Sequence, residues 1–242
     1  MKLNGRTALV TGGGTGIGWG IARALAAEGC RVVIAGRRAQ PLADAVGGWQ
    51  GTPILHHTVD VTDRASVAAL VESTLQRLGS IDILVNSAGT NIKTRTLAEM
   101  QPAQWDEVMA INATGVYNCM YAVLPTMRKR KDGLIVNISS TSGKRAAPLG
   151  GVAYDASKFA VAALSTAAWN EEAANGIRVT TVFPGEVDTP ILEKRPTAVS
   201  DERRSRMLLP EDVGQIVLAI ALLPPRAHVP ELIIKPITQE YI

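Results

Sequence analysis

Short apolar runs alternate with longer helical patterns along the whole of this 242-residue chain. Continuous apolar runs are typical of strands buried on both faces of a sheet, and helices between them favour parallel pairing. Strands are expected at 7–10, 31–35, 54–59, 81–85, 134–138, 177–183 and 232–235. The pattern predicts an α/β fold with a doubly wound parallel sheet of about seven strands, covered by helices on both faces.

Helices are expected at 19–28, 41–46, 65–78, 102–130, 154–175 and 211–223. Asp63 and Gly79 suit the two ends of the helix over 65–78. Asn112 lies inside the helix over 102–130, where Asn is unfavourable, so a local kink is expected there. No linker or repeat divides the chain, which predicts a single domain over 1–242. The segment 190–210 is polar and weakly periodic, and we expect a substrate lid there.

Composition excludes several classes of partner. A hydrophobic content of 46% is ample for one large core, and a net charge of +3 is too small to favour nucleic acid or a membrane surface as a partner. Cys30 and Cys119 are far apart and have no disulfide or metal-ligand spacing. We expect no metal, a small-molecule substrate and, since no signal peptide or bilayer-spanning run is visible, a cytoplasmic protein.

A glycine-rich turn joins the first expected strand to the first helix. Glycine tolerates positive φ and lets the backbone approach a pyrophosphate, while the new helix offers free N–H groups. Strand, glycine turn and helix together predict a dinucleotide site, the alternative being a plain connecting turn. The candidate residues are Gly12, Gly14, Thr15, Gly16, Ile17 and Gly18.

Two arginines, Arg37 and Arg38, follow the second expected strand, and no acid is present there. An acid at this position binds the ribose hydroxyls of NAD, whereas arginine accommodates the 2′-phosphate of NADP. Guanidinium binds phosphate by bidentate hydrogen bonds. NADP(H) is therefore the expected cofactor and NAD the alternative, unless these are ordinary surface arginines.

Tyr154 and Lys158 are four residues apart in an Ala-rich helical run, so they share one helix face. A free Tyr has a pKa of about 10 and needs a shift of about 3 units to act as a base at pH 7. A nearby ammonium favours the phenolate. By spacing alone the two could equally be a structural pair. Parallel sheets bind ligands beyond the carboxyl ends of their strands, however, and Tyr154 follows such an end.

The chain resembles the short-chain dehydrogenase/reductase family over essentially its whole length. The similar motifs are the turn over 11–18, Asp60-Val61, Asn86-Ser-Ala-Gly89, Asn112-Ala-Thr-Gly115, Ile138-Ser-Ser140, Tyr154-Asp-Ala-Ser-Lys158 and Pro184-Gly-Glu-Val-Asp-Thr189. The resemblance implies a Rossmann-type fold and hydride transfer between a nicotinamide cofactor and a carbonyl or secondary alcohol.

The resemblance also implies roles for single residues. Tyr154 would be the general acid/base and Ser140 would bind the substrate oxygen. Lys158 would lower the pKa of Tyr154 and bind the nicotinamide ribose, and Asn112 would hold the kink and a water. Further cofactor contacts would come from Asp60, Val61, Asn86, Ala88, Gly89, Pro184, Gly185, Val187 and Thr189. Ser87 and Thr15 depart from the usual pattern, the latter because NADP-preferring members often carry a basic residue there.

Several alternatives stay open. The protein could be an NADP(H)-dependent carbonyl reductase, an NAD-linked hydroxy acid or sugar alcohol dehydrogenase, or a cofactor-binding sensor without turnover. Basic residues expected at the mouth of the site are either solvated or bind an anionic substrate: Lys93, Arg95, Lys144, Arg145, Lys194 and Arg195. Family members commonly pair through helices equivalent to 102–130 and 154–175, so a homodimer or homotetramer is expected.

Overall fold

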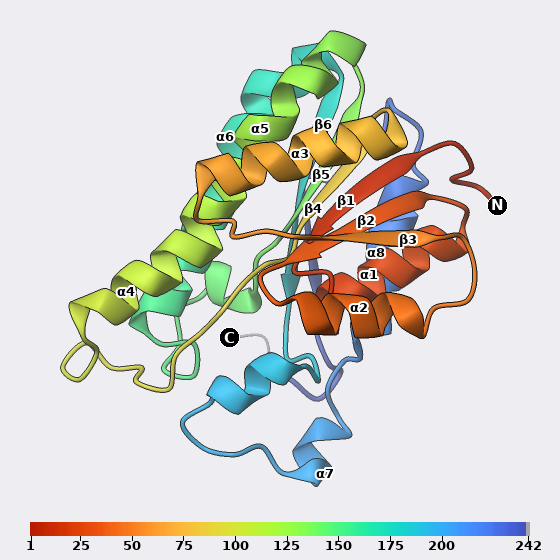
Figure 1. Cartoon of the computed structure of the whole chain (residues 1–242). Coiled ribbons are helices and arrows are strands. Elements are labelled where there is room, and N and C mark those ends of the chain that lie inside the picture. Colours follow the sequence, from red (N-terminus) through yellow and green to blue (C-terminus); the bar gives the residue numbers. More distant parts are fainter. Residues whose placement is uncertain (241–242) are drawn as a thin grey trace.

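A computed structural model describes residues 1–240 of the chain (Figure 1). Seven strands form one parallel sheet in the order β3-β2-β1-β4-β5-β6-β7. They are β1 Thr7–Thr11, β2 Arg31–Gly36, β3 Ile54–Thr58, β4 Ile83–Asn86, β5 Gly133–Ile138, β6 Ile177–Pro184 and β7 Glu231–Ile234. The strand order reverses between β1 and β4, which is where such sheets bind ligands. The predicted doubly wound fold is confirmed.

Helices cover both faces of the sheet (Figure 1). One face carries α1 Gly16–Ala27, α2 Ala39–Gly47 and α8 Pro210–Ala221, and the other carries α3 Arg64–Leu78, α5 Gly115–Arg130 and α6 Val152–Glu172. Each face has its own apolar core. Ile21 and Val217 pack into the first core, and Leu70 and Val161 into the second. These side chains recur at helical spacing along their helices, which is why the helices bury one stripe each.

The helix predicted over 102–130 is interrupted as expected. It consists of α4 Pro102–Met109, a π-helical turn η1 at Ala110–Thr114 and then α5. Asn112 lies in the middle of the π turn. Gly115 follows it because a Cβ there would lie 2.6 Å from the Cγ2 of Val61. Single π turns of this kind are frequent at functional sites.

The segment after β6 folds back so that its arginines contact Glu186, two residues after the end of β6. It contains a short 3-10 helix, η4 Pro190–Lys194, and one helical turn, α7 Asp201–Arg204. Arg195 and Arg203 both bind Glu186, at 2.7 and 2.8 Å. These ion pairs hold the segment at the carboxyl end of the sheet, below the strands in Figure 1.

Most predicted boundaries agree with the structure to within two or three residues. The N-cap prediction for Asp63 is confirmed, since its side chain accepts a hydrogen bond from the Ala65 N–H, and Gly79 ends α3 with a φ of 85°. The first helix begins at Gly16, three residues before the predicted start, because the glycine turn leads into it directly. Within residues 1–240, no helix has the length and hydropathy needed to cross a bilayer.

Candidate active site

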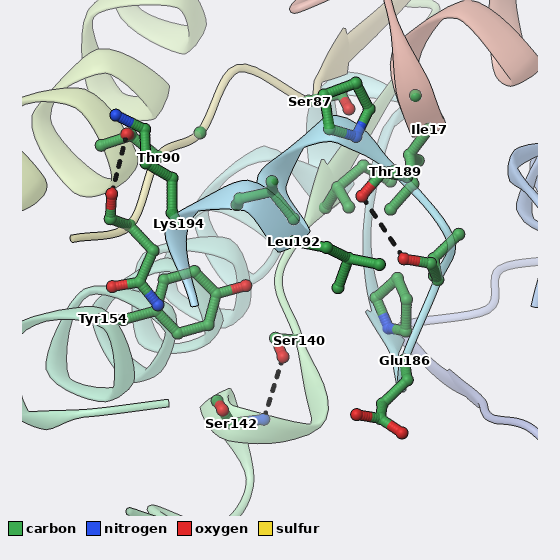
Figure 2. A pocket seen from close by; sticks show the side chains of 18 of the residues that line it. Ile17, Ser87, Thr90, Ser140, Ser142, Tyr154, Glu186, Thr189, Leu192 and Lys194 are labelled. Atoms are coloured by element: carbon green, nitrogen blue, oxygen red, sulfur yellow. Dashed lines mark hydrogen bonds between the residues drawn. The ribbon is translucent and has the colours of Figure 1, made fainter. Parts of the chain in front are cut away.

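A cavity of about 1900 Å³ opens at the carboxyl ends of the strands. That exceeds the usual volume of roughly 300–1,000 Å³ for a small-molecule site, so it has room for a dinucleotide and a substrate together. Most predicted site residues line it: Gly12, Gly14, Thr15, Gly16, Ile17, Gly18, Arg37, Arg38, Val61, Ala88, Gly89, Ser140, Tyr154, Lys158, Pro184, Gly185, Val187 and Thr189. Figure 2 shows Tyr154, Ser140, Leu192 and Thr189 around this space.

Three residues predicted at the site do not line the cavity: Asn86, Asp60 and Asn112. The Asn86 side chain is buried and donates a 2.8 Å hydrogen bond to Asn137, the residue opposite it on β5. Strand pairing therefore directs it into the protein interior. The Asp60 carboxylate accepts hydrogen bonds from the N–H and hydroxyl of Thr62, at 2.9 and 2.7 Å. The bond from the Thr62 N–H, and then the bond from its hydroxyl, lower the pKa of Asp60. Both bonds hold the Asp60 side chain in the turn formed by residues 60–62.

Asn112 also lies outside the cavity lining, one layer behind it. Its side chain accepts from the Thr90 N–H at 2.8 Å and donates to the Thr90 carbonyl at 3.0 Å. It also donates to the Ser157 hydroxyl at 3.0 Å. Asn112 thus ties the loop after β4 to α6. The predicted kink is present, and its side chain serves the scaffold of the site.

The glycine turn is packed tightly against neighbouring backbone. A Cβ on Gly12 would lie 2.7 Å from the Ala88 nitrogen, and one on Gly18 would lie 2.3 Å from the Gly12 carbonyl oxygen. Thr15, at the N-cap of α1, makes no side-chain capping bond, and the first turn of α1 has no acidic residue. The N–H groups and positive dipole end of α1 are therefore free for an anion, which fits a nucleotide pyrophosphate.

Tyr154 lies in the first turn of α6 and faces the cavity. Burial raises the pKa of its phenol, while the Ser140 hydroxyl and the charges of Arg95 and Arg195 lower it. The net direction is upward, so the phenol is protonated at neutral pH in the protein without ligand. A half-buried, protonated phenol that faces the cavity is suited to donate a proton.

Lys158 shares the cavity face of α6 with Tyr154, as the four-residue spacing predicts, and its Nζ lies 5.5 Å from the centroid of the Tyr154 ring. Burial lowers the pKa of Lys158 to about 8. The ammonium donates to the Ile138 carbonyl at 2.9 Å. The charges of Arg95 and Arg195 also act on the Tyr154 phenol and lower its pKa.

Ser140 and Ser139 have different surroundings, although they are adjacent. Ser140 lines the cavity, and its Oγ accepts a 3.1 Å hydrogen bond from the Ser142 N–H, which is drawn in Figure 2. The Ser139 hydroxyl is buried and donates to the Lys158 carbonyl at 2.9 Å. Of the two, Ser140 is therefore the one available to a ligand.

The basic residues predicted at the mouth divide into two groups. Four of them line the cavity: Arg95, Arg145, Lys194 and Arg195. Lys144 points away from it and forms an ion pair with Glu231. The prediction for Lys144 was wrong because the turn after β5 sends adjacent side chains to opposite sides. Lys93 is exposed and does not line the cavity either.

Asp155 and Gln239 contribute to the site and were not predicted. Asp155 is buried beside Tyr154, accepts from the Ala147 N–H at 2.8 Å, and has a pKa raised mainly by burial. The Gln239 side chain accepts from the Glu186 N–H at 2.8 Å and lines the cavity. An acid next to Tyr154 was a visible signal. No sequence motif marked Gln239 as a site residue, because only the tertiary structure brings it to the cavity.

Comparison with known proteins identifies the family of the chain. The family model for short chain dehydrogenase matches residues 6–200. The chain is 36% identical over 228 residues to a 3-oxoacyl-(acyl-carrier-protein) reductase of Thermotoga maritima, covering 91% of this chain and 92% of the relative.

Solved structures agree over nearly the whole chain. A serine dehydrogenase complexed with NADP⁺ has a TM-score of 0.89 at 29% identity, over 97% of this chain and 96% of its own. A 3-ketoacyl-(acyl-carrier-protein) reductase of Brucella melitensis complexed with NADH has a TM-score of 0.88 at 29% identity, over 96% of this chain and 98% of its own. The chain belongs to the short-chain dehydrogenase/reductase family and is an NAD(P)-dependent oxidoreductase.

Proposed function

We propose that this enzyme transfers a hydride between NADP(H) and a carbonyl or secondary alcohol, with Tyr154 as general acid/base. The observation that carries the proposal is the position of the Tyr154 phenol and the Ser140 hydroxyl in one cavity with the free N-terminus of α1. A proton donor and a nucleotide site thus meet at the switch point of the sheet.

In the reductive direction the bound nicotinamide supplies the hydride to the carbonyl carbon. Tyr154 gives its proton to the carbonyl oxygen, and Ser140 hydrogen-bonds the same oxygen as negative charge develops on it. Burial keeps the phenol protonated before this step. In our proposal Lys158 binds the nicotinamide ribose and lowers the pKa of Tyr154 once the cofactor is bound, and Asn112 holds the π turn and a water that links Lys158 to solvent.

The cofactor residues follow from the cavity lining. Gly12, Gly14, Thr15, Gly16, Ile17 and Gly18 would surround the pyrophosphate, Val61, Ala88 and Gly89 the adenine and ribose, and Pro184, Gly185, Val187 and Thr189 the nicotinamide end. Neither side chain reaches the cavity, so Asp60 would act through the turn that it holds and Asn86 through its hydrogen bond to Asn137 on β5.

NADP(H) is proposed over NAD(H) because Arg37 and Arg38 line the cavity beside α2. Both guanidiniums are exposed and available to a 2′-phosphate. The serine dehydrogenase to which the chain is similar holds NADP⁺, whereas the similar reductase of Brucella melitensis holds NADH. An NAD-linked hydroxy acid or sugar alcohol dehydrogenase is therefore the second candidate.

The segment 190–210 is proposed to be the substrate lid, because Ile191, Leu192, Lys194 and Arg195 form one wall of the cavity. We also propose a homodimer or homotetramer that pairs through α5 and α6. Three aromatic side chains on these helices are exposed: Tyr117, Tyr121 and Phe159. A monomer mass in solution would contradict the oligomer.

A panel of carbonyls and alcohols, assayed with each cofactor separately by absorbance of the reduced nicotinamide, tests the activity. Turnover of at least one carbonyl is expected. Dissociation constants for NADPH and NADH, measured by tryptophan fluorescence, test the cofactor. Tighter binding of NADH would overturn NADP(H), and absence of turnover over the whole panel would favour the sensor.

A further inference from the structure

Two arginines, Arg95 and Arg195, line the cavity and act on Tyr154. Arg95 belongs to the loop between β4 and α4, and Arg195 directly follows η4 in the lid segment 190–210. They come from parts of the chain that are 100 residues apart in sequence. Both arginines line the same cavity as Tyr154 and Ser140, and both charges lower the pKa of the Tyr154 phenol.

Arg95 has no carboxylate within ion-pair distance among residues 1–240. Its Nη1 donates to the carbonyls of Leu149 and Gly150, and its Nη2 donates to the Lys194 carbonyl at 2.9 Å. A guanidinium carries five N–H donors. The Nε–H is shielded from the cavity and has no partner among residues 1–240, so one Nη2–H of Arg95 is left for a ligand.

The charge of Arg195 is only partly balanced. Its side chain is 12% exposed and binds Glu186 at 2.7 Å. The same Glu186 oxygen also binds Arg203 at 2.8 Å, so one carboxylate serves two guanidiniums. With Arg95 added, positive charge exceeds negative charge on this wall. Asp155 also acts on Arg95, and burial raises the pKa of this carboxyl.

Uncompensated charge in a half-buried position costs free energy. Burial and the charge of Arg195 both lower the pKa of Arg95, which records this cost. A bound anion would remove it, because guanidinium and carboxylate form parallel charge-assisted hydrogen bonds. Unbalanced positive charge next to a proton donor is more typical of a binding site than of a structural ion pair.

We infer that the substrate carries a carboxylate, which binds Arg95 and Arg195 while its carbonyl or hydroxyl lies against Tyr154 and Ser140. The inference rests on the proposed function and narrows the substrate class to small oxo acids and the corresponding hydroxy acids.

The test compares oxo acids with their methyl esters, which keep the reacting carbonyl and remove the charge. Pyruvate, acetoacetate and levulinate place the carboxylate at increasing distance from the carbonyl. The kcat/KM of at least one acid should exceed that of its ester by about tenfold or more, the value of one hydrogen bond to a charged group. Equal kcat/KM for acid and ester in all three pairs would overturn the inference and leave the proposed function intact.

Two variants test whether Arg95 and Arg195 cause the preference for acids over esters. Arg95→Gln and Arg195→Gln should each lower the ratio of acid to ester kcat/KM by about tenfold. Arg206→Gln is the matched control, because Arg206 also lines the cavity but is 61% exposed and paired with Glu202 at 2.8 Å. An unchanged ratio in both Arg95→Gln and Arg195→Gln would overturn the assignment. If one of the two variants does not fold, the ratio in the other variant and the comparison of acids with esters in the wild-type enzyme test the assignment.

If no carbonyl or alcohol of the whole panel turns over with either cofactor, the proposed function fails and the inference is tested by binding alone. Calorimetry then measures each oxo acid against the NADP⁺-loaded protein, a complex that cannot react. Binding that is about tenfold weaker in Arg95→Gln supports the carboxylate site, and equal binding overturns it.

Discussion

The Lys158 ammonium donates a 2.9 Å hydrogen bond to the Ile138 carbonyl at the end of β5. Next to this contact, the Ser139 hydroxyl donates to the Lys158 carbonyl, also at 2.9 Å. These two bonds join the start of α6 to the end of β5. They fix the position of Tyr154 relative to Ser140, because Tyr154 lies on α6 and Ser140 follows the end of β5 by two residues.

Lys158→Met should remove a pH dependence of stability. The pKa of Lys158 is about 8 in the folded protein against a usual value of 10.5, so between these values the unfolded chain binds more protons. The contribution of Lys158 to the free energy of unfolding therefore rises from pH 8 to 10.5 and is constant and unfavourable below pH 8. The stability advantage of the Met variant at pH 7 should shrink by up to about 3 kcal/mol by pH 10.5.

This difference is measured by urea denaturation without nucleotide at both pH values. Lys129→Met, at the exposed end of α5, serves as the control and should show no such trend. A gap between wild type and Lys158→Met that is the same at pH 7 and pH 10.5 would contradict the lowered pKa.

Tyr154→Phe should abolish most of the turnover while leaving cofactor binding intact. The phenol hydroxyl is the proton donor in our proposal, and general acid catalysis contributes about 10²- to 10⁴-fold. Steady-state kcat on the best substrate of the panel and fluorescence titration with NADPH measure the two effects. Tyr117→Phe, on the exposed face of α5, is the matched control. Unchanged kcat in Tyr154→Phe would refute the catalytic assignment.

Replacing Arg37 and Arg38 together by Ala should weaken NADPH binding by about 10- to 100-fold, since hydrogen bonds to a charged phosphate contribute about 1.5–3 kcal/mol. NADH lacks the 2′-phosphate, so its dissociation constant should not change. Arg226→Ala is the control, because Arg226 is exposed in the loop before β7, at the opposite end of the sheet. An equal loss for both cofactors would mean that the arginines do not discriminate between them.

Gly18→Ala should destabilise the fold and weaken nucleotide binding. The added Cβ would lie 2.3 Å from the Gly12 carbonyl oxygen, and backbone cannot yield as a side chain can. Such overpacking costs about 1–3 kcal/mol, visible as a lower melting temperature. Gly47→Ala, where no atom lies within 4 Å of the added Cβ, should be neutral or stabilising. A Gly18→Ala protein as stable as wild type would show that the turn can open.

The fold and most of the cavity lining could be predicted from the sequence because they depend on local patterns. Apolar runs and helical periodicity identify β1 to β7, and parallel strands bring the turns after Thr11, Ile138 and Pro184 to one edge. The four-residue spacing of Tyr154 and Lys158 places both on one face of α6 without any knowledge of the rest of the chain.

Side-chain direction and charge balance were decided only by the tertiary structure. Asn86 turns inward because Asn137 lies opposite it on β5, and Lys144 turns away from the cavity toward Glu231. Arg95 and Arg195 line one cavity only because the segment 190–210 folds back onto Glu186. Hydrogen-bond partners and counter-ions depend on contacts between residues distant in sequence, and no local pattern specifies them. The sequence therefore determines the oxidoreductase scaffold, while the folded charge arrangement decides what substrate we expect it to accept.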